Sequence, residues 1–437
     1  MGKVVLIVAI LILLDHSMIR AQNCIPGTLV LNEQSEIDSF PSNYPGCENI
    51  LGSLTIMESA TGSITDLSPL GQLKTVHGNL RIRENDSLTN LYGIHNLDSV
   101  GGDLKIQLNP SLTSISDLIN LNHINDELNI WGNDSLESLS GIDSVGRIGG
   151  DVYIVENPLL KDFIGFPKLD TIHGRFRIAS NQGMTSLAGL ESIRWIGGLW
   201  VYESDSLTNL NGLNTLSRIA GFLEVVGNDR LIDLSGLDSV TRIGWFLRIV
   251  DNESLRSPTG LEQLESINGY LKVEYNDSLL NLDALSQLDT IQGLLHIVDN
   301  DALVDLSGLD SVRSVGLDMI VTDNDMLNDI SSLMNVRSVN GYIHIENNPM
   351  LSSLTGLDSL DHQKLTDLIL LDNPTLSYCH VKSICEYLLI PANHDSIAGN
   401  ATGCSDRLQV NGNCFTGDVS GSPPDELRVF PVPVNDI

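Results

Sequence analysis

The sequence is poor in aromatic residues, which make up 5% of its 437 positions, whereas Leu, Ile and Val are plentiful. This balance favours a narrow, layered aliphatic core over one built on large rings. Basic residues are also few, since 24 Lys and Arg stand against 56 Asp and Glu, for a formal net charge of -32. A charge of that sign repels nucleic acids and anionic membrane surfaces, and we therefore expect no nucleic-acid partner.

No apolar run is long enough to cross a bilayer. The run at 4–14 has eleven residues and follows Lys3, a combination that is typical of a secretory signal peptide. Residues 17–21 supply a cleavage region, and we expect cleavage after Ala21. The sequence thus predicts a signal peptide at 1–21 and a secreted or outer-surface protein without a transmembrane segment.

The sequence also lacks the common catalytic and nucleotide-binding motifs. HExxH, GxSxG, the P-loop and GxGxxG do not occur in a suitable context, and the ten histidines are scattered. Sites in β-helix enzymes form where long loops or clustered acids and bases interrupt a repeat. Here the repeat barely varies, so we expect no catalytic residues. A polysaccharide-active β-helix enzyme is the alternative.

Cysteine is missing from the middle of the chain. Two cysteines precede the repeats described below and four follow them, which indicates an oxidising compartment and disulfides that staple the two ends. We expect Cys24 to pair with Cys47. Of the three possible pairings among the last four cysteines, we favour Cys379 with Cys404 and Cys385 with Cys414. Zinc binding by these four is the alternative, although a CxxC pair is missing. The cysteines are Cys24, Cys47, Cys379, Cys385, Cys404 and Cys414.

What the sequence does contain is a repeat of 24 residues, marked by one Asn. The unit reads G-x-L-x-I-x-x-N-x-x-L-x-x-L-x-G-L-x-x-L-x-x-I. Ser204 occupies the Asn position once, one residue early. The marker residues are Asn85, Asn109, Asn133, Asn157, Asn181, Asn228, Asn252, Asn276, Asn300, Asn324, Asn348 and Asn373.

The period of the apolar residues predicts the fold. The alternating L-x-I segment predicts one short strand per turn with two inward side chains. The later apolar positions, three residues apart, predict tight 3₁₀-like turns. We therefore predict a mainly β protein, a single right-handed parallel β-solenoid of about thirteen repeats at 51–376. Disulfide-stapled caps at 22–50 and 377–416 would cover its ends.

The marker Asn has a structural interpretation. An inward Asn at a bend can satisfy buried backbone donors and acceptors, and stacked copies form a ladder. Four of these residues, Asn85, Asn133, Asn252 and Asn276, begin N-x-S sequons. Because the ladder would direct them inward, we interpret them as structural and not as glycosylation sites.

Carboxylates flank the marker position on both sides in several repeats. Stacked one strand spacing apart, these acids repel one another, and Ca²⁺ would relieve the repulsion because it prefers oxygen ligands. The alternative, which we favour, is that the acids stay solvated at tight turns and that no metal or other cofactor is held. The flanking acids are Glu84, Asp86, Glu203, Asp205, Asp251, Glu253, Asp299, Asp301, Asp323 and Asp325.

The outward side chains of the strands form the candidate binding site. This surface is richer in bases than the net charge suggests, and it carries a cluster of large aromatics. Trp, Tyr and Arg often carry binding energy, and exposed aromatics mark contact sites. Ordinary cross-strand stabilisation is the alternative interpretation. The predicted ligand-binding residues are Tyr153, Arg177, Trp200, Tyr202, Phe222, Phe246, Arg248 and Tyr270.

The unit G-x-L-x-I-x-x-N-x-x-L resembles the repeat of the receptor L-domain family, the leucine-rich-repeat-like β-helix of growth-factor receptor ectodomains, over residues 51–376. Receptor L domains are shorter and come in pairs, so their ligands are not carried over. Residues 428–437 resemble the start of a type IX secretion sorting domain, V-[YF]-P-N-P-x-x-D, with Val432 in place of the Asn. This second resemblance implies a Bacteroidota-type bacterial source, with 417–427 as a linker.

Together these features predict a monomeric, non-catalytic binding or adhesion module. Its partner would be an extracellular protein or a glycan. A flat aromatic strip could stack on sugar rings, whereas the bases could meet an acidic protein or an anionic glycan, and the sequence leaves this choice open. Besides the enzyme alternative, the chain could be a structural spacer for another domain.

Overall fold

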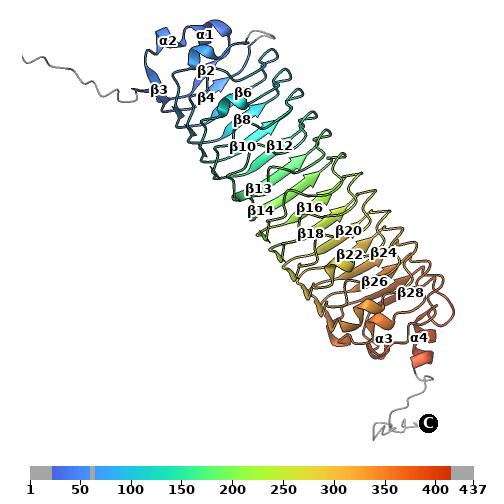
Figure 1. Ribbon diagram of the computed structural model, residues 1–437. Helices are drawn as coiled ribbons and strands as arrows, with labels where there is room; N and C mark the ends of the chain where they lie inside the picture. Colours follow the sequence, from blue (N-terminus) through green and yellow to red (C-terminus); the bar gives the residue numbers. More distant parts are fainter. Residues whose placement is uncertain (1–21, 60–63, 415–437) are drawn as a thin grey trace, which may run out of the picture. The chain divides into compact units, whose positions relative to one another are not determined.

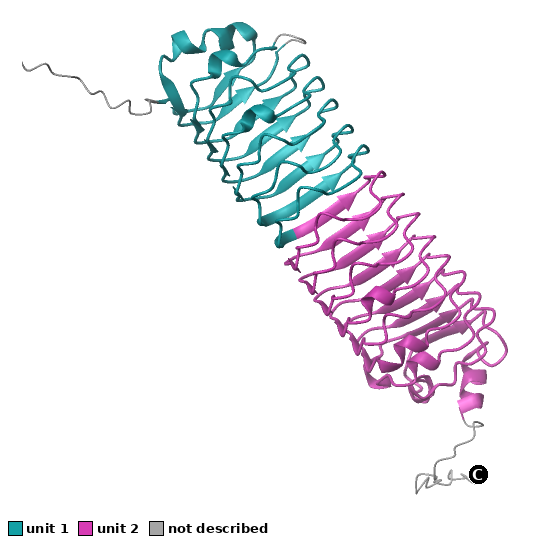
Figure 2. Cartoon of the chain, in the orientation of Figure 1, with its two compact units in different colours: residues 1–197 teal, residues 198–437 magenta. Residues whose placement is uncertain are grey.

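The structure is a computed structural model that describes residues 22–59 and 64–414, and it divides into two compact units, residues 1–197 and 198–437 (Figure 2). The described part of each unit is a parallel β-solenoid (Figure 1). The predicted signal peptide, the linker at 417–427 and the sorting segment at 428–437 lie outside the described residues. The right-handed winding stays a prediction.

In the first unit, the L-x-I positions form the predicted strands. The first and third residues of each four-residue strand are buried, as in Leu80 and Ile82, and the register joins equivalent residues of successive turns, as in Leu80 with Leu104. The strands of this kind are β4 (Leu54–Ile56), β6 (Leu80–Arg83), β8 (Leu104–Gln107), β10 (Leu128–Trp131), β12 (Val152–Val155) and the longer β13 (Thr171–Ala179).

Most turns also contain a second strand of two residues, so the expectation of one strand per turn is wrong. It ends at the Ile or Val before the glycine corner, where the backbones of successive turns approach closely. A Cβ on Gly149 would lie 1.8 Å from the carbonyl oxygen of Asn125, and the missing side chain lets these corners hydrogen-bond. In the first unit these strands are β5 (Thr75–Val76), β7 (Ser99–Val100), β9 (His123–Ile124) and β11 (Arg147–Ile148).

The second unit has the same two sets of strands. The first set is β14 (Trp195–Tyr202), of which residues from 198 on belong to this unit, β16 (Leu223–Val226), β18 (Leu247–Val250), β20 (Leu271–Glu274), β22 (Leu295–Val298), β24 (Met319–Thr322), β26 (Ile343–Glu346) and β27 (Leu368–Leu371). The second set is β15 (Arg218–Ile219), β17 (Arg242–Ile243), β19 (Ser266–Ile267), β21 (Thr290–Ile291), β23 (Ser314–Val315) and β25 (Ser338–Val339).

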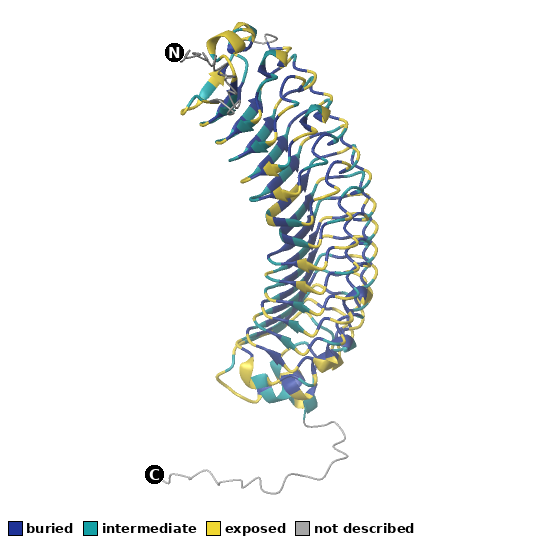
Figure 3. Cartoon of the chain, turned by 60° about the vertical axis from the view of Figure 1, so that its left-hand side comes forward, coloured by how far each residue is buried: buried dark blue, intermediate teal, exposed yellow. Residues whose placement is uncertain are grey.

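Tight turns connect the strands, and several are 3₁₀ helices, as the three-residue spacing predicts. These are η1 (Ser68–Leu70), η2 (Ser116–Leu118), η3 (Asp283–Leu285), η4 (Ser331–Asn335), η5 (Thr355–Leu357) and η6 (His362–Lys364). Aliphatic side chains from strands and turns fill the inside of each solenoid, so buried residues follow the strands while exposed ones concentrate in the connecting loops (Figure 3).

Strand pairing continues into both segments that the sequence assigns to caps. In the first unit β1 (Gln22–Cys24) pairs with β3 (Cys47–Ile50), and β2 (Leu29–Leu31) pairs with β4. In the second unit β28 (Asp395–Ala398) pairs with β27. The ladders therefore extend beyond the expected limits of 51 and 376, because these segments supply alternating residues without the full repeat motif.

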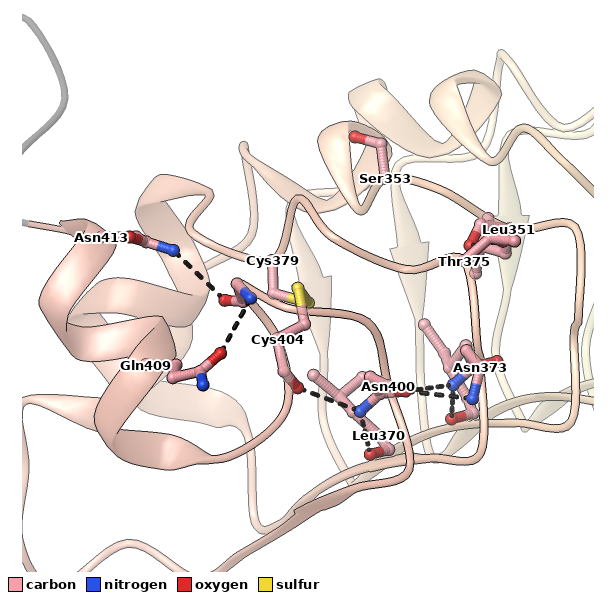
Figure 4. Close-up of a disulfide and its surroundings, with 12 residues drawn as sticks. Leu351, Ser353, Leu370, Asn373, Thr375, Cys379, Asn400, Cys404, Gln409 and Asn413 are labelled. Atoms are coloured by element: carbon pink, nitrogen blue, oxygen red, sulfur yellow. Dashed lines mark hydrogen bonds between the residues drawn. A yellow bond between two sulfur atoms is a disulfide. The ribbon is translucent and has the colours of Figure 1, made fainter.

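Short helices and disulfides complete the two ends. The helices are α1 (Gln34–Asp38) and α2 (Phe40–Asn43) in the first unit, and α3 (Lys382–Leu388) and α4 (Arg407–Cys414) in the second. Within the described ranges, no helix has both the length and the apolar character needed to span a membrane. The disulfides join Cys24 with Cys47, Cys379 with Cys404, and Cys385 with Cys414, which confirms the favoured pairing. Figure 4 shows the Cys379–Cys404 bond.

Candidate binding face of the second unit

A ladder of buried asparagines fixes the geometry of the strands beside it. The Asn252 backbone N–H and Nδ2 both donate to Oδ1 of Asn276, at 3.2 and 3.1 Å. Nδ2 of Asn252 also donates to the carbonyl oxygens of Val225 and Val250, at 3.1 and 3.0 Å. The side chain is fully buried with these groups paired, so its amide nitrogen is not accessible for attachment of a glycan.

The residue before each ladder position adopts left-handed backbone angles, as in Asp251 with φ of 55° and Gly227 with φ of 65°. This bend turns the next side chain inward, and short polar residues and glycine tolerate it best. Where Ser204 replaces Asn, its backbone N–H still donates to Oδ1 of Asn228, at 3.1 Å, while its hydroxyl donates to the carbonyl oxygen of Tyr202. With the shorter side chain, the backbone hydrogen bond to the next rung is therefore preserved.

The last rung of the ladder is Asn400, which the 24-residue period does not predict. Its Oδ1 accepts hydrogen bonds from the backbone N–H and Nδ2 of Asn373, both at 3.1 Å, and its Nδ2 donates to the carbonyl oxygens of Leu370 and Cys404 (Figure 4). The spacing from Asn373 is 27 residues, which hides Asn400 from a search at the regular period.

Three outward side chains on or directly before each strand make up the face, and the parallel register places equivalent residues side by side. Of the predicted site residues, Tyr153 and Arg177 are neighbours on β12 and β13 of the first unit. The others belong to the second unit, so the predicted site is distributed over both. We call the outward side chains at 198–298 of the second unit the ladder face; its predicted members are Trp200, Tyr202, Phe222, Phe246, Arg248 and Tyr270.

The aromatic residues of the ladder face stack on one another. Ring centroids are 4.8 Å apart for Trp200 and Phe222, 5.3 Å for Phe222 and Phe246, and 4.4 Å for Phe246 and Tyr270. The last two pairs are nearly parallel, with interplanar angles of 14° and 8°. Phe222 is only 6% exposed, because it also covers the backbone of Gly198. The expectation that Phe222 is a freely exposed contact residue is therefore wrong.

Basic residues of the ladder face have carboxylate partners. The Arg248 guanidinium lies 3.4 Å from Glu224, a largely buried residue that also accepts a hydrogen bond from the Tyr202 hydroxyl. A buried carboxylate is stabilised only if it is paired and hydrogen-bonded, and here both conditions hold. Arg248 is therefore engaged within the face, and its charge is balanced locally.

A second set of charges lies two turns further along the chain. Lys272 Nζ lies 3.3 Å from the Glu274 carboxylate, which also contacts His296. Burial alone would raise the pKa of Glu274, but the hydrogen bond from His296 and the nearby positive charges hold this pKa below its usual range. Lys272 Nζ also lies 5.7 Å from the centre of the Tyr270 ring. The ladder face thus balances its charges internally.

In the first unit, Tyr153 and Arg177 line a shallow depression together with Asn129 and Trp131. The Tyr153 hydroxyl donates to Asp151 at 2.7 Å. Burial, this hydrogen bond and the charge of Asp151 raise the pKa of Tyr153 to about 12, so the phenol is neutral at physiological pH. This depression is a separate local feature, and Arg177 is exposed at its rim.

The acidic bends border the ladder face on the side where the strands end. Burial and the neighbouring carboxylates raise the pKa of Asp299 and of Asp301 above the usual range. Asp205 is affected in the same way by burial, Asp229 and Glu203. Across residues 22–59 and 64–414, no group of three or more His, Cys, Asp or Glu side chains converges in a way that could hold a metal ion.

Comparisons with known proteins do not assign the chain to a family. It matches no known protein family, and it matches no curated protein. Among solved structures it is similar to one described as "Crystal structure of TLR13-ssRNA13 complex", with 14% sequence identity and a TM-score of 0.23, over 86% of this chain and 78% of that chain. This similarity is too weak to show a shared fold or function. The leucine-rich-repeat-like character of the fold therefore rests on its own aliphatic columns and 24-residue register.

Proposed function

We propose that this protein is a secreted or cell-surface recognition module without catalytic activity, and that it binds an extracellular partner through the ladder face. The observation that carries the proposal is the order of this surface. Its rings are stacked and its charges paired before any ligand arrives, so little side-chain entropy is lost on binding. The three disulfides support an oxidising, extracellular compartment.

The stacking favours a protein partner over a glycan. Both faces of Phe222 and of Phe246 are covered by neighbouring rings, and a sugar needs an open ring face for stacking. The ring edges and the aliphatic side chains between them suit the apolar surface of a protein. Trp245, which is 61% exposed beside Phe222, adds one large open ring of the kind that often anchors protein interfaces.

The sequence resemblances support the same proposal. The repeat resembles that of receptor L domains, which serve extracellular recognition, and residues 428–437 resemble the start of a type IX sorting domain. If both resemblances hold, the protein is exported by a Bacteroidota-type bacterium and acts at or beyond the cell surface.

The test is a binding screen against extracellular proteins and glycans, with wild type and a triple variant, Trp200→Ala, Tyr202→Ala and Arg248→Ala. We expect the variant to lose the partner at least ten-fold in affinity. Because it also removes both partners of the buried Glu224 carboxylate, it should be less stable than wild type, so binding is compared at a temperature at which circular dichroism shows both proteins fully folded. Tyr92→Ala and Ile164→Ala, which remove exposed side chains of the first unit, serve as the matched control. A triple variant that keeps every interaction of the wild type would make the ladder face purely structural.

A further inference from the structure

A groove runs along the side of the ladder face where the strands of the second unit end. It joins apolar side chains of strands β16 and β18 to the acidic bends that follow β18, β20 and β22. Its lining residues are Val226, Val250, Asp251, Glu253, Tyr275, Asp277, Asp299 and Asp301. Asp299 and Asp301 also line an adjoining depression, together with Asp323, Asp325 and Asp372. One wall is thus acidic over several turns.

The lining combines three chemical properties. The two valines provide an apolar floor. Tyr275, 49% exposed, occupies the bend position held in neighbouring turns by Asp251 and Asp299, with φ of 57°. Carboxylates form the remaining wall. A bulky ring in left-handed backbone geometry is unfavourable by itself, and here it places an aromatic side chain directly among acids.

These acids repel one another in the free protein. Partial burial and the charges of Asp277 and Asp325 raise the pKa of Asp299 and of Asp301. A positively charged ligand would remove this repulsion. The carboxylates are distributed along successive turns and do not converge on one point, which disfavours a single metal ion and favours an elongated ligand with several positive charges.

We propose that this groove binds an arginine- or lysine-rich segment of a partner protein. The aliphatic stem of such a side chain fits the valine floor, its charged end reaches the carboxylates, and the Tyr275 ring supplies a cation–π contact. Arginine suits the groove best, because its planar guanidinium forms paired hydrogen bonds with carboxylates. The inference rests on the proposed function and specifies the partner as basic; an acidic protein or an anionic glycan would be repelled.

The experiment measures binding of a fluorescent octa-arginine peptide by anisotropy, in low and in physiological salt, with a glycine-serine octapeptide as the negative probe. The test variant is Asp299→Asn with Asp301→Asn. The matched control is Glu265→Gln with Asp289→Asn, two exposed acids of the same unit outside the groove. Both variants change the net charge equally. We expect about ten-fold weaker binding for the test variant and less than two-fold for the control.

Tyr275→Ser is the second variant. It leaves every charge in place, and we expect it to weaken peptide binding by roughly two- to five-fold through loss of the cation–π contact. Equal losses in the test and control variants would show attraction to net charge alone and would overturn the proposal. Displacement of the peptide by millimolar CaCl₂, with a calcium-dependent rise in Tm that the Asp299→Asn, Asp301→Asn variant lacks, would identify a metal site instead and would also overturn it.

The two proposals fail separately. If the Trp200→Ala, Tyr202→Ala, Arg248→Ala variant loses the natural partner while the Asp299→Asn, Asp301→Asn variant keeps both partner and peptide, the ladder face binds without the groove, and this inference is wrong. If the Asp299→Asn, Asp301→Asn variant weakens binding of both peptide and partner while the Trp200→Ala, Tyr202→Ala, Arg248→Ala variant keeps every partner, the groove stands and the proposed function of the ladder face fails.

Discussion

At the scale of a single residue, the ladder asparagines accept hydrogen bonds from one turn and donate hydrogen bonds to the next. Oδ1 of Asn252 accepts two hydrogen bonds from Asn228, at 3.2 Å each, while Nδ2 donates to two carbonyl oxygens and to the next rung. A leucine has the same branched arrangement of heavy atoms but can make none of these bonds. The position is therefore specified by hydrogen bonding and not by hydrophobicity.

We predict that Asn252→Leu destabilises the protein by about 4 kcal/mol, because it leaves several buried donors and acceptors unpaired and each costs roughly 1–3 kcal/mol. The measurement is the midpoint of urea unfolding. Asn328→Leu, at an exposed position outside the ladder, is the control and should change stability by less than about 0.5 kcal/mol. Similar effects of both substitutions would show that the hydrogen bonds of the ladder do not contribute to stability.

Glycine acts at the same scale where the chain turns behind the strands. Gly236 has φ of 110°, and a Cβ there would lie 2.1 Å from the carbonyl oxygen of Leu210. We expect Gly236→Ala to cost about 3 kcal/mol, from backbone strain together with displacement of the neighbouring turn. Gly146→Ala is the control, since a Cβ at Gly146 meets no atom within 4 Å and its φ is not positive. Thermal unfolding of the two variants measures the difference.

At the scale of the element, the acidic bend has a pH dependence whose sign follows from its pKa shifts. The folded-state pKa of Asp299 and of Asp301 is raised. Each carboxyl therefore favours the folded state when protonated, and this contribution is lost as pH rises through the ordinary Asp pKa, near 4, to the higher folded-state value.

We predict that the Asp299→Asn, Asp301→Asn variant is slightly more stable than wild type at pH 7, and equally stable at pH 3. The gain at pH 7 should lie near the low end of the roughly 0.2–1 kcal/mol range for cross-strand charge pairs, because the groups are solvent-screened. Urea unfolding at both pH values measures it. A loss of stability at pH 7 would show that the two carboxylates are stabilised by a cation or another partner.

Prediction of the elements from sequence succeeds where residues of one turn interact with equivalent residues of the next. The 24-residue spacing is sufficient for β18 and for the rung at Asn252, because both bond to partners one period away. It is insufficient for Asn400 and β28, which join the ladder at a different spacing. The two-residue strands also escape prediction, because a run so short has no period of its own.

The candidate site is less predictable than the fold for a related reason. An outward position does not specify exposure, and Phe222 is covered because its neighbour on one side is Gly198 and on the other Phe246. In the same way, the single acid at Glu224 neutralises Arg248 only because their turns are adjacent. The groove is harder still to predict from sequence, because it brings Val226 and Val250 together with acids from the bends of several turns.

At the scale of the whole molecule, covalent links close the two ends. We predict that Cys385→Ser with Cys414→Ser lowers stability by about 3 kcal/mol, the range for a disulfide that closes a loop of this size, here with a sequence separation of 29. Thermal unfolding of the oxidised protein and the variant provides the measurement. Non-reducing peptide mapping is the check on the wild type, and free thiols in the mature protein would contradict the assigned pairs.

The asparagine ladder also has a direction. In the second unit, every rung from Asn228 to Asn348 donates to the rung that follows it and accepts from the one before. Aligned amides of this kind polarise one another, so the rungs strengthen as a series. Any interior turn therefore presents the same acceptor to the turn before it and the same donors to the turn after it, and a duplicated turn of 24 residues could be inserted between two existing ones. At Asn400 this rule ends, because its amide donates to Cys404 in the disulfide-linked end. A turn added there would have to displace that end, whereas a turn added between two interior turns would not.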